Sequence, residues 1–278
     1  MNENRTHQLT ATDGTTIAGT VHGRGPDLVF VHGIMGDGDS DWQALLPHVA
    51  DRYTCHLLST RGRGLSDDHP DHGRGRLIDD IVAYVESLGG PTGLVGYSSG
   101  GGMTLAAAAQ ADAVKAIAVY EPALTALLDD QQQGAFRDTV IRVGEIAAQG
   151  DLTAAARAWA GFVYHDDEIA QLEDTGYLER IGRYIPALLN DIQQGARSEG
   201  ANAADPAVLE RISAPMLVLH GPETALSWFT ACVQHLADHV LGVRVREIPG
   251  AGHSAPLTHP EALGNTIARF FDHAHQPA

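Results

Sequence analysis

The chain has 278 residues, of which 44% are hydrophobic and 19% charged, and its formal net charge is −17. This length can form one large α/β domain or two small ones, and the composition is typical of a compact globular protein rather than a disordered or coiled-coil one. Lys115 is the one lysine, and no cluster of positive charge offers contacts to phosphates, which argues against nucleic-acid binding. The arginines between positions 61 and 76 alternate with aspartates and predict a solvated loop.

The sequence shows no charged start followed by an apolar signal core, and no stretch approaching the roughly 20 apolar residues of a membrane span. We therefore expect a soluble, cytoplasmic protein. Cys55 and Cys232 have apolar neighbours and are expected to be reduced core residues, with a disulfide as the alternative.

The first 120 residues alternate short apolar runs with segments of helical spacing. The expected strands are 6–10, 17–22, 28–31, 53–59, 94–97 and 114–120. The expected helices are 42–49, 77–88 and 103–111. Asp13-Gly14 is a hairpin turn signal between the first two strands. An initial hairpin followed by this alternation predicts an α/β fold with a mostly parallel central sheet and helices on both faces.

The strand signals stop at Glu121 and resume after Asp205. Alternation then returns, with strands expected at 216–220 and 243–248 and helices at 225–241 and 260–273. A helical insertion after the sixth strand of a parallel sheet lies above the carboxyl edge, where such sheets bind ligands. We therefore expect residues 1–120 and 206–278 to form the core and residues 121–205 a helical cap. A separate helical domain unrelated to the site is the alternative.

A serine motif joins an expected strand to an expected helix. Gly96-Tyr97-Ser98-Ser99-Gly100 in this context predicts a nucleophile elbow, with Ser98 at its apex and a helix N-terminus beneath it. An ordinary Gly/Ser-rich turn is the alternative. The backbone N–H groups of Ser99 and of Ile34, which follows His32-Gly33, are expected to bind an oxyanion.

A late histidine provides the expected general base. His253 lies in a glycine-flanked loop after the last expected strand and before the last helix, and the order nucleophile then base is the one expected for this topology. Its place on the same sheet edge as Ser98 distinguishes it from the other histidines of the chain, 15 in all.

These motifs together resemble the α/β-hydrolase superfamily, from about Leu28 to the end of the chain. The residues that carry the resemblance are His32-Gly33, Arg61-Gly62-Arg63-Gly64-Leu65-Ser66, Gly96-Tyr97-Ser98-Ser99-Gly100 and Gly252-His253. The resemblance implies a cofactor-free hydrolase of esters, lactones or amides, while some similar proteins are lyases, C–C bond hydrolases or cofactor-free haloperoxidases. A serine at the elbow argues against haloalkane dehalogenases and epoxide hydrolases, which have aspartate there.

The third residue of the expected triad departs from the family pattern. The resemblance places an aspartate three residues beyond Gly221, where this chain has Thr224. Two glutamates could replace it. Glu223 lies one residue earlier in the same loop, and Glu121 ends the preceding expected strand, where some similar hydrolases keep their acid. We favour Glu121, with a carboxylate that merely caps the entrance of the first cap helix as its alternative role.

The cap aromatics supply candidate pocket walls, because substrate pockets are mostly apolar. We expect a few of them to face Ser98, together with Trp228; the candidates are Trp159, Phe162, Tyr164, Tyr177 and Tyr184. His165-Asp166-Asp167, and His69 with His72, lack the ligand set of a metal site and are expected in solvated loops, so no metal or cofactor is predicted.

The sequence thus predicts a cofactor-free serine hydrolase of the carboxylesterase or lactonase type that acts on a small-molecule carbonyl substrate through an acyl-enzyme. One alternative is a ligand-binding protein that has lost turnover together with the missing aspartate. Another is a lyase or C–C bond hydrolase that uses the same triad.

Overall fold

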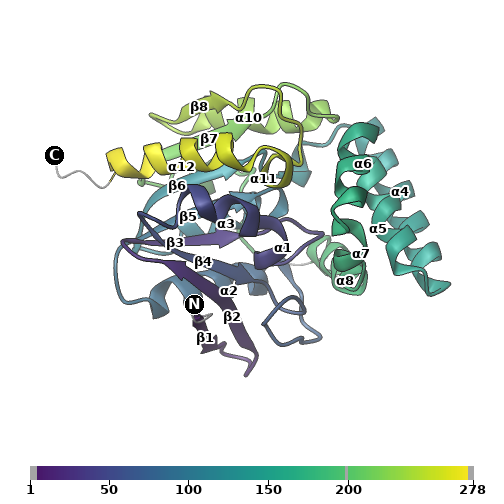
Figure 1. The fold of residues 1–278 in the computed structure, drawn as a ribbon, viewed down its shortest axis with the longest axis horizontal. Coiled ribbons are helices and arrows are strands. Elements are labelled where there is room, and N and C mark those ends of the chain that lie inside the picture. Colours follow the sequence, from purple (N-terminus) through teal and green to yellow (C-terminus); the bar gives the residue numbers. More distant parts are fainter. Residues whose placement is uncertain (1–4, 198–199, 275–278) are drawn as a thin grey trace.

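The computed structural model describes residues 5–197 and 200–274 and shows one eight-stranded sheet in the order β1-β2-β4-β3-β5-β6-β7-β8 (Figure 1). β2 pairs antiparallel with β1 and β4, and all the other neighbours pair in parallel. The expected initial hairpin and mostly parallel sheet are therefore confirmed. The strands are β1 (Arg5–Thr10), β2 (Thr16–Gly23), β3 (Asp27–Val31), β4 (Thr54–Ser59), β5 (Thr92–Tyr97), β6 (Val114–Tyr120), β7 (Met216–His220) and β8 (Arg244–Glu247).

Helices cover both faces of the sheet, because successive side chains of each buried strand point to opposite sides. Along β3, Val29 and Val31 join the cluster that includes α2, α3 and α10, while Leu28 and Phe30 join the cluster that includes α12. The bounds of these helices are α2 (Arg74–Ser87), α3 (Ser99–Ala108), α10 (Ser227–His239) and α12 (Pro260–Ala274). The four-residue α11 (Ala255–Thr258) precedes α12.

The helix expected over residues 42–49 is wrong in its bounds and type. α1 (Gly38–Trp42) ends where that helix was expected to begin, and a 3₁₀ helix, η1 (Gln43–His48), follows it. Asp37 begins α1 because its carboxylate accepts the backbone N–H of Ser40. Pro47 has no N–H to donate within η1, which disfavours continuous α-helical hydrogen bonding there.

The segment between β6 and β7 is helical, and its helices α4 to α8 form an apolar cluster that also includes Met35. Figure 1 shows its helices α4 to α8 gathered beyond one end of the sheet, beside α1. The helical elements of the whole segment are η2 (Thr125–Leu127), α4 (Asp130–Ala148), α5 (Leu152–Val163), α6 (Asp166–Asp174), α7 (Tyr177–Gly182), α8 (Ile185–Gly195) and α9 (Pro206–Leu209). Within the described ranges, none of the helices is both long and apolar enough to cross a membrane.

The arginine-rich stretch after β4 is not the solvated loop that its composition predicted. Arg61, Arg63 and His72 are all buried. Arg61 makes two hydrogen bonds to the Asp80 carboxylate in α2, and Arg63 forms an ion pair with Asp191 in α8 at 2.7 Å. Acidic partners from elements distant in sequence allow these charges to be buried, and a local pattern of alternating charge could not reveal them.

Both cysteines lie in the core, on opposite faces of the sheet. Cys55 belongs to the cluster around α12, and Cys232 lies in α10 within the other cluster. Both are free and buried, and burial raises the pKa of each thiol to about 12. The expectation of two reduced core thiols is confirmed.

Candidate active site

Ser98 occupies a sharp turn between β5 and α3. Its backbone has a positive φ of 54° with ψ −122°, a conformation that a residue with a side chain adopts only at a cost of about 1–3 kcal/mol. The flanking glycines are required by packing. A Cβ at Gly100 would lie 2.2 Å from the carbonyl oxygen of His32, and one at Gly96 would lie 2.5 Å from the hydroxyl of Thr104. This crowding keeps the turn tight and presents the Ser98 hydroxyl at its apex.

His253 faces the serine from the loop between β8 and α11. Its Nε2 lies 3.1 Å from Ser98 Oγ, although the two residues are 155 positions apart in the chain. The imidazole stacks on the ring of Phe229 in α10, with 3.9 Å between centroids and 18° between planes. This stacking and the burial of His253 restrict the ring to an orientation that can accept the serine proton.

Glu121 is the carboxylate that the structure brings to His253. Its Oε2 lies 2.6 Å from His253 Nδ1, and its side chain is fully buried at the end of β6. The backbone of Glu121 also has a positive φ, 39°, which aims the side chain across the end of β7. The N–H of Gly221 donates to Oε1 at 3.0 Å and the hydroxyl of Thr224 donates to Oε2 at 3.2 Å. These two donors hold the carboxylate beside the imidazole.

The loop after β7 carries no acid that contacts the histidine. Glu223 is exposed, and its recorded contact is a backbone hydrogen bond to Ala251. Thr224, at the position where the family pattern predicts aspartate, hydrogen-bonds to Glu121 instead. The loop therefore supports a carboxylate supplied by the neighbouring strand.

The two expected oxyanion donors lie beside Ser98. Ile34 and Ser99 both line the same cavity as the serine. Ser99 is the first residue of α3, and the N–H groups of the first turn of a helix have no acceptor within that helix. The partial positive charge of this terminus favours an anion close to Ser98.

A cavity of about 520 Å³ opens onto Ser98 and His253. Five of the six expected wall residues line it, and they include Trp159, Phe162 and Trp228. Tyr164 and Tyr177 line it as well, and the Tyr164 hydroxyl lies 3.0 Å from that of Tyr97. Further apolar walls come from Met35, Met103, Leu124, Leu128 and Phe136. The cavity thus lies between the carboxyl ends of the strands and the helical insertion.

Tyr184, which we expected to line this cavity, lies elsewhere. Its hydroxyl donates to the Asp37 carboxylate and accepts the N–H of Gly64 at 3.1 Å. It borders a second depression that is lined by neither Ser98 nor His253. Tyr184 precedes α8, and these two polar partners draw its ring toward the loops after β3 and β4.

Sequence reasoning missed several residues of the site. Phe229 could not be recognised as a site residue, because an aromatic residue in an amphipathic helix is usually part of the hydrophobic core. Thr224 was noticed only as a departure from the family pattern, although its hydroxyl contacts the acid. Asp41 also lines the cavity and is buried, and no motif in the sequence pointed to it. In residues 5–197 and 200–274, no group of three or more His, Cys, Asp or Glu side chains could hold a metal ion.

The fold and this arrangement of serine, histidine and carboxylate at a sheet edge are those of the α/β-hydrolase class. The sequence pattern of a family described as "Alpha/beta hydrolase family" matches residues 28–265, and the chain belongs to that family.

Comparison with individual proteins shows related enzymes. The chain is 26% identical to 2-(acetamidomethylene)succinate hydrolase of Mesorhizobium japonicum over 260 residues, covering 90% of this chain and 89% of that protein. It is 32% identical to pyrrolizixenacetamide deacetylase of Xenorhabdus hominickii over 94 residues, which is 32% of this chain and only 34% of the deacetylase. An alpha/beta hydrolase from Sphaerobacter thermophilus has a similar structure, with a TM-score of 0.75, 26% identity and coverage of 95% of this chain and 100% of that one.

Proposed function

We propose that the protein is a cofactor-free serine hydrolase that cleaves carboxylic esters or lactones of small molecules through an acyl-enzyme. The observation that carries the proposal is the continuous hydrogen-bonded chain from Ser98 through His253 to Glu121, with distances of 3.1 and 2.6 Å. The names of the two curated relatives, a hydrolase and a deacetylase, support a hydrolytic reaction at an acyl carbonyl.

In the first half of the reaction, Ser98 Oγ attacks the carbonyl carbon and its proton passes to His253 Nε2. The Glu121 carboxylate accepts the hydrogen bond from Nδ1–H, which leaves Nε2 free to act as the base and then stabilises the imidazolium. The N–H groups of Ile34 and Ser99 bind the negative oxygen of the tetrahedral intermediate. His253 next donates the proton from Nε2 to the leaving oxygen, and the acyl-enzyme remains.

In the second half, water attacks the acyl-enzyme after losing a proton to His253. The same N–H groups stabilise the second tetrahedral intermediate. Its collapse releases the acid and returns the proton to Ser98. The cavity walls are mainly aromatic and aliphatic, so the acyl or leaving group that fits best is a small, largely apolar one. In this proposal residues 121–205 act as a cap that supplies much of the wall.

The test combines a fluorophosphonate probe with a series of p-nitrophenyl esters. We expect the wild type to be labelled and to hydrolyse short esters, Ser98→Ala to lose both properties, and His253→Ala to lose turnover. Labelling that survives in Ser98→Ala would refute the nucleophile assignment. Labelling of the wild type without turnover of any ester or lactone would refute ester and lactone hydrolysis and favour a lyase or C–C bond hydrolase. The ligand-binding alternative was based on the missing aspartate. Because Glu121 lies beside His253, the absence of that aspartate no longer favours a protein without turnover.

A further inference from the structure

The peptide group that would aim one oxyanion donor is held by a side chain that lies outside the proposed triad. The Ile34 N–H belongs to the same planar peptide as the carbonyl of Gly33. In a trans peptide the N–H and C=O point in opposite directions, so fixing the oxygen fixes the direction of the N–H. His32 Nδ1 lies 2.7 Å from this Gly33 oxygen, and its Nε2 accepts the N–H of Thr60 at 3.1 Å.

His32 is therefore a neutral imidazole with its proton on Nδ1. Burial lowers the pKa of His32 to about 4, which agrees with a ring that accepts a hydrogen bond at Nε2.

The two groups on either side of that peptide are held as well. The N–H of Gly33 donates to Asp41 Oδ2 at 2.8 Å, and the carbonyl of Ile34 accepts from Arg63 Nη2 at 3.0 Å. Asp41 and Arg63 are both buried. The loop also wraps tightly around this carboxyl, since a Cβ at Gly36 would lie 2.0 Å from Asp41 Oδ1. The short segment that carries the oxyanion donor is thus clamped along its length.

Asp41 and Arg63, the two outer clamps of this segment, are both bonded to the helical insertion. The Tyr177 hydroxyl, from the first residue of α7, donates to Asp41 Oδ1 at 2.7 Å. Arg63 Nη2 forms an ion pair with Asp191 Oδ2 in α8 at 2.7 Å. Asp191 in turn lies 2.6 Å from His72 Nδ1, so its carboxylate is engaged on both oxygens. Each outer clamp therefore spans the boundary between the strand-end loops and the insertion.

We propose that Asp41 and Arg63 are positioning residues for the oxyanion hole, and that through Tyr177 and Asp191 they couple the seating of the helical insertion to the aim of the Ile34 N–H. This inference rests on the proposed hydrolase function. Among the described residues, neither side chain forms a hydrogen bond with Ser98 or His253, although Asp41 borders the cavity, so the proposed effect on geometry is one on kcat rather than KM. When Asp41 or Arg63 is removed, the loop holds the Ile34 N–H in the wrong direction, which weakens transition-state binding more than substrate binding.

The experiment measures kcat and KM for a p-nitrophenyl ester and the rate of fluorophosphonate labelling in a small set of variants. Removing one oxyanion donor costs about 10²–10³-fold in kcat in a known hydrolase, so we expect a misaligned donor in Arg63→Met to cost about 10–100-fold, with KM within about threefold of the wild type. Asp41→Ala should behave alike. Asp41→Asn keeps an oxygen for the Gly33 N–H and should recover part of the kcat that Asp41→Ala loses.

Tyr177→Phe guards against variants that fail to fold, because it removes a single oxygen from the contact with Asp41. We expect kcat to fall about three- to tenfold for this variant, a size typical of coupling through one packed contact. The Ser98 hydroxyl is untouched, so every variant should still be labelled to completion by the probe, at a reduced rate.

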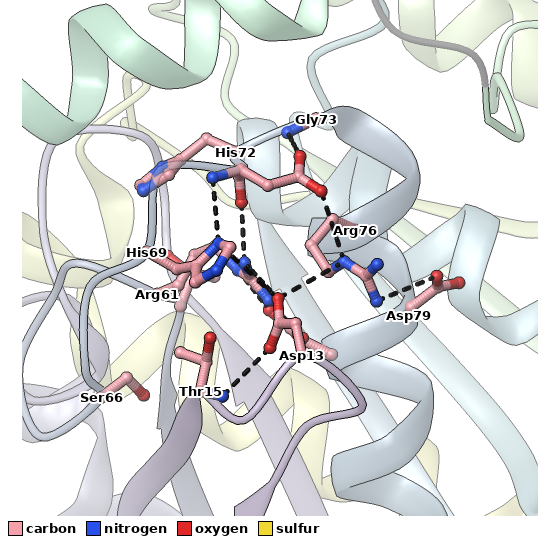
Figure 2. Close-up of polar contacts among 12 residues, drawn as sticks. Asp13, Thr15, Arg61, Ser66, His69, His72, Gly73, Arg76 and Asp79 are labelled. Carbon is pink, nitrogen blue, oxygen red and sulfur yellow. Dashed lines mark hydrogen bonds and ion pairs between the residues drawn. The ribbon is translucent and has the colours of Figure 1, made fainter.

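Arg61→Met is the matched control. Arg61 is as buried as Arg63, pairs with Asp80 and donates to Asp13 (Figure 2), and forms no hydrogen bond or ion pair with the described residues 33–35. It should lose stability in urea unfolding yet keep the wild-type kcat per folded molecule. If the Arg63 and Tyr177 variants match this control, the clamp is refuted while the hydrolase proposal stands. A wild type that neither labels nor turns over would instead refute the hydrolase proposal itself.

Discussion

Replacing Glu121 by glutamine tests the role of the buried carboxylate while keeping its shape. In the structure Oε2 accepts from His253 and Thr224, and Oε1 accepts the N–H of Gly221. A glutamine has one oxygen and one NH₂ for these two positions. If the NH₂ faces His253 it donates to Nδ1, which places the imidazole proton on Nε2 and leaves no base for Ser98. If the NH₂ faces Gly221, two donors meet in a buried site.

Either orientation of the glutamine removes the negative charge that stabilises the imidazolium. The corresponding aspartate-to-asparagine change in a chymotrypsin-type triad lowers kcat about 10⁴-fold with the geometry intact. We expect Glu121→Gln to lower kcat by about 10³–10⁴-fold, which corresponds to about 4–5.5 kcal/mol of activation free energy. KM should change little, because Glu121 does not line the cavity.

The assay is steady-state hydrolysis of a short p-nitrophenyl ester, with urea unfolding to confirm that the variant is folded. Glu223→Gln makes the same chemical change at an exposed residue one position before Thr224 and should keep the wild-type kcat. A folded Glu121→Gln protein with at least a tenth of the wild-type kcat would refute the reasoning. So would a Glu223→Gln protein with the larger loss.

Three further outcomes are expected. Burial raises the pKa of Asp41 to about 7, so its contribution to stability is fully present below about pH 4 and is lost as the pH rises through 7; the difference is on the order of 4 kcal/mol. Asp41→Asn should therefore flatten the decline of unfolding free energy between pH 4.5 and 8 in urea titrations, and an unchanged slope would contradict it. Gly100→Ala should destabilise the fold by about 1–3 kcal/mol or more, because the new Cβ meets backbone oxygens, whereas Gly144→Ala in α4 has free space and should stabilise it by about 0.5–1 kcal/mol. Trp159→Ala removes part of the cavity wall and enlarges the cavity, so it should raise kcat/KM for octanoyl relative to butyryl p-nitrophenyl esters. An unchanged ratio would show that Trp159 does not contact the acyl group.

The fold was predictable to a large extent because its buried strands are continuous apolar runs. The strands expected at 114–120 and 216–220 have the observed bounds, and the others differ by one or two residues at one or both ends. The errors arise where distant partners decide the structure. The helix expected at 42–49 is largely a 3₁₀ helix, η1, over residues 43–48. The arginines at 61 and 63 are buried because carboxylates from other parts of the chain reach them.

The serine and histidine of the site could be proposed from local motifs, whereas for the acid the sequence left two glutamates open, of which we favoured Glu121. The elbow around Ser98 needs glycines at fixed spacing, which the sequence displays directly. Glu121 and His253 are 132 positions apart, and their contact depends on how the ends of three strands and one loop come together. Tyr184 shows the same limit, since its ring turns toward Asp37 rather than toward the cavity.

The register between β6 and β7 explains how the end of one strand can replace the loop that follows the next. Tyr120 is paired with Leu219, and the Glu121 N–H donates to the Leu219 carbonyl, so Glu121 stands beside the start of the loop after β7. Its carboxylate then receives the Gly221 N–H and the Thr224 hydroxyl, donors from the segment where the family pattern places its acid. Among the described residues, positive φ outside glycine occurs only at Ser98 and Glu121. Strain of this kind persists where surrounding contacts impose it, and here it coincides with both ends of the proposed triad.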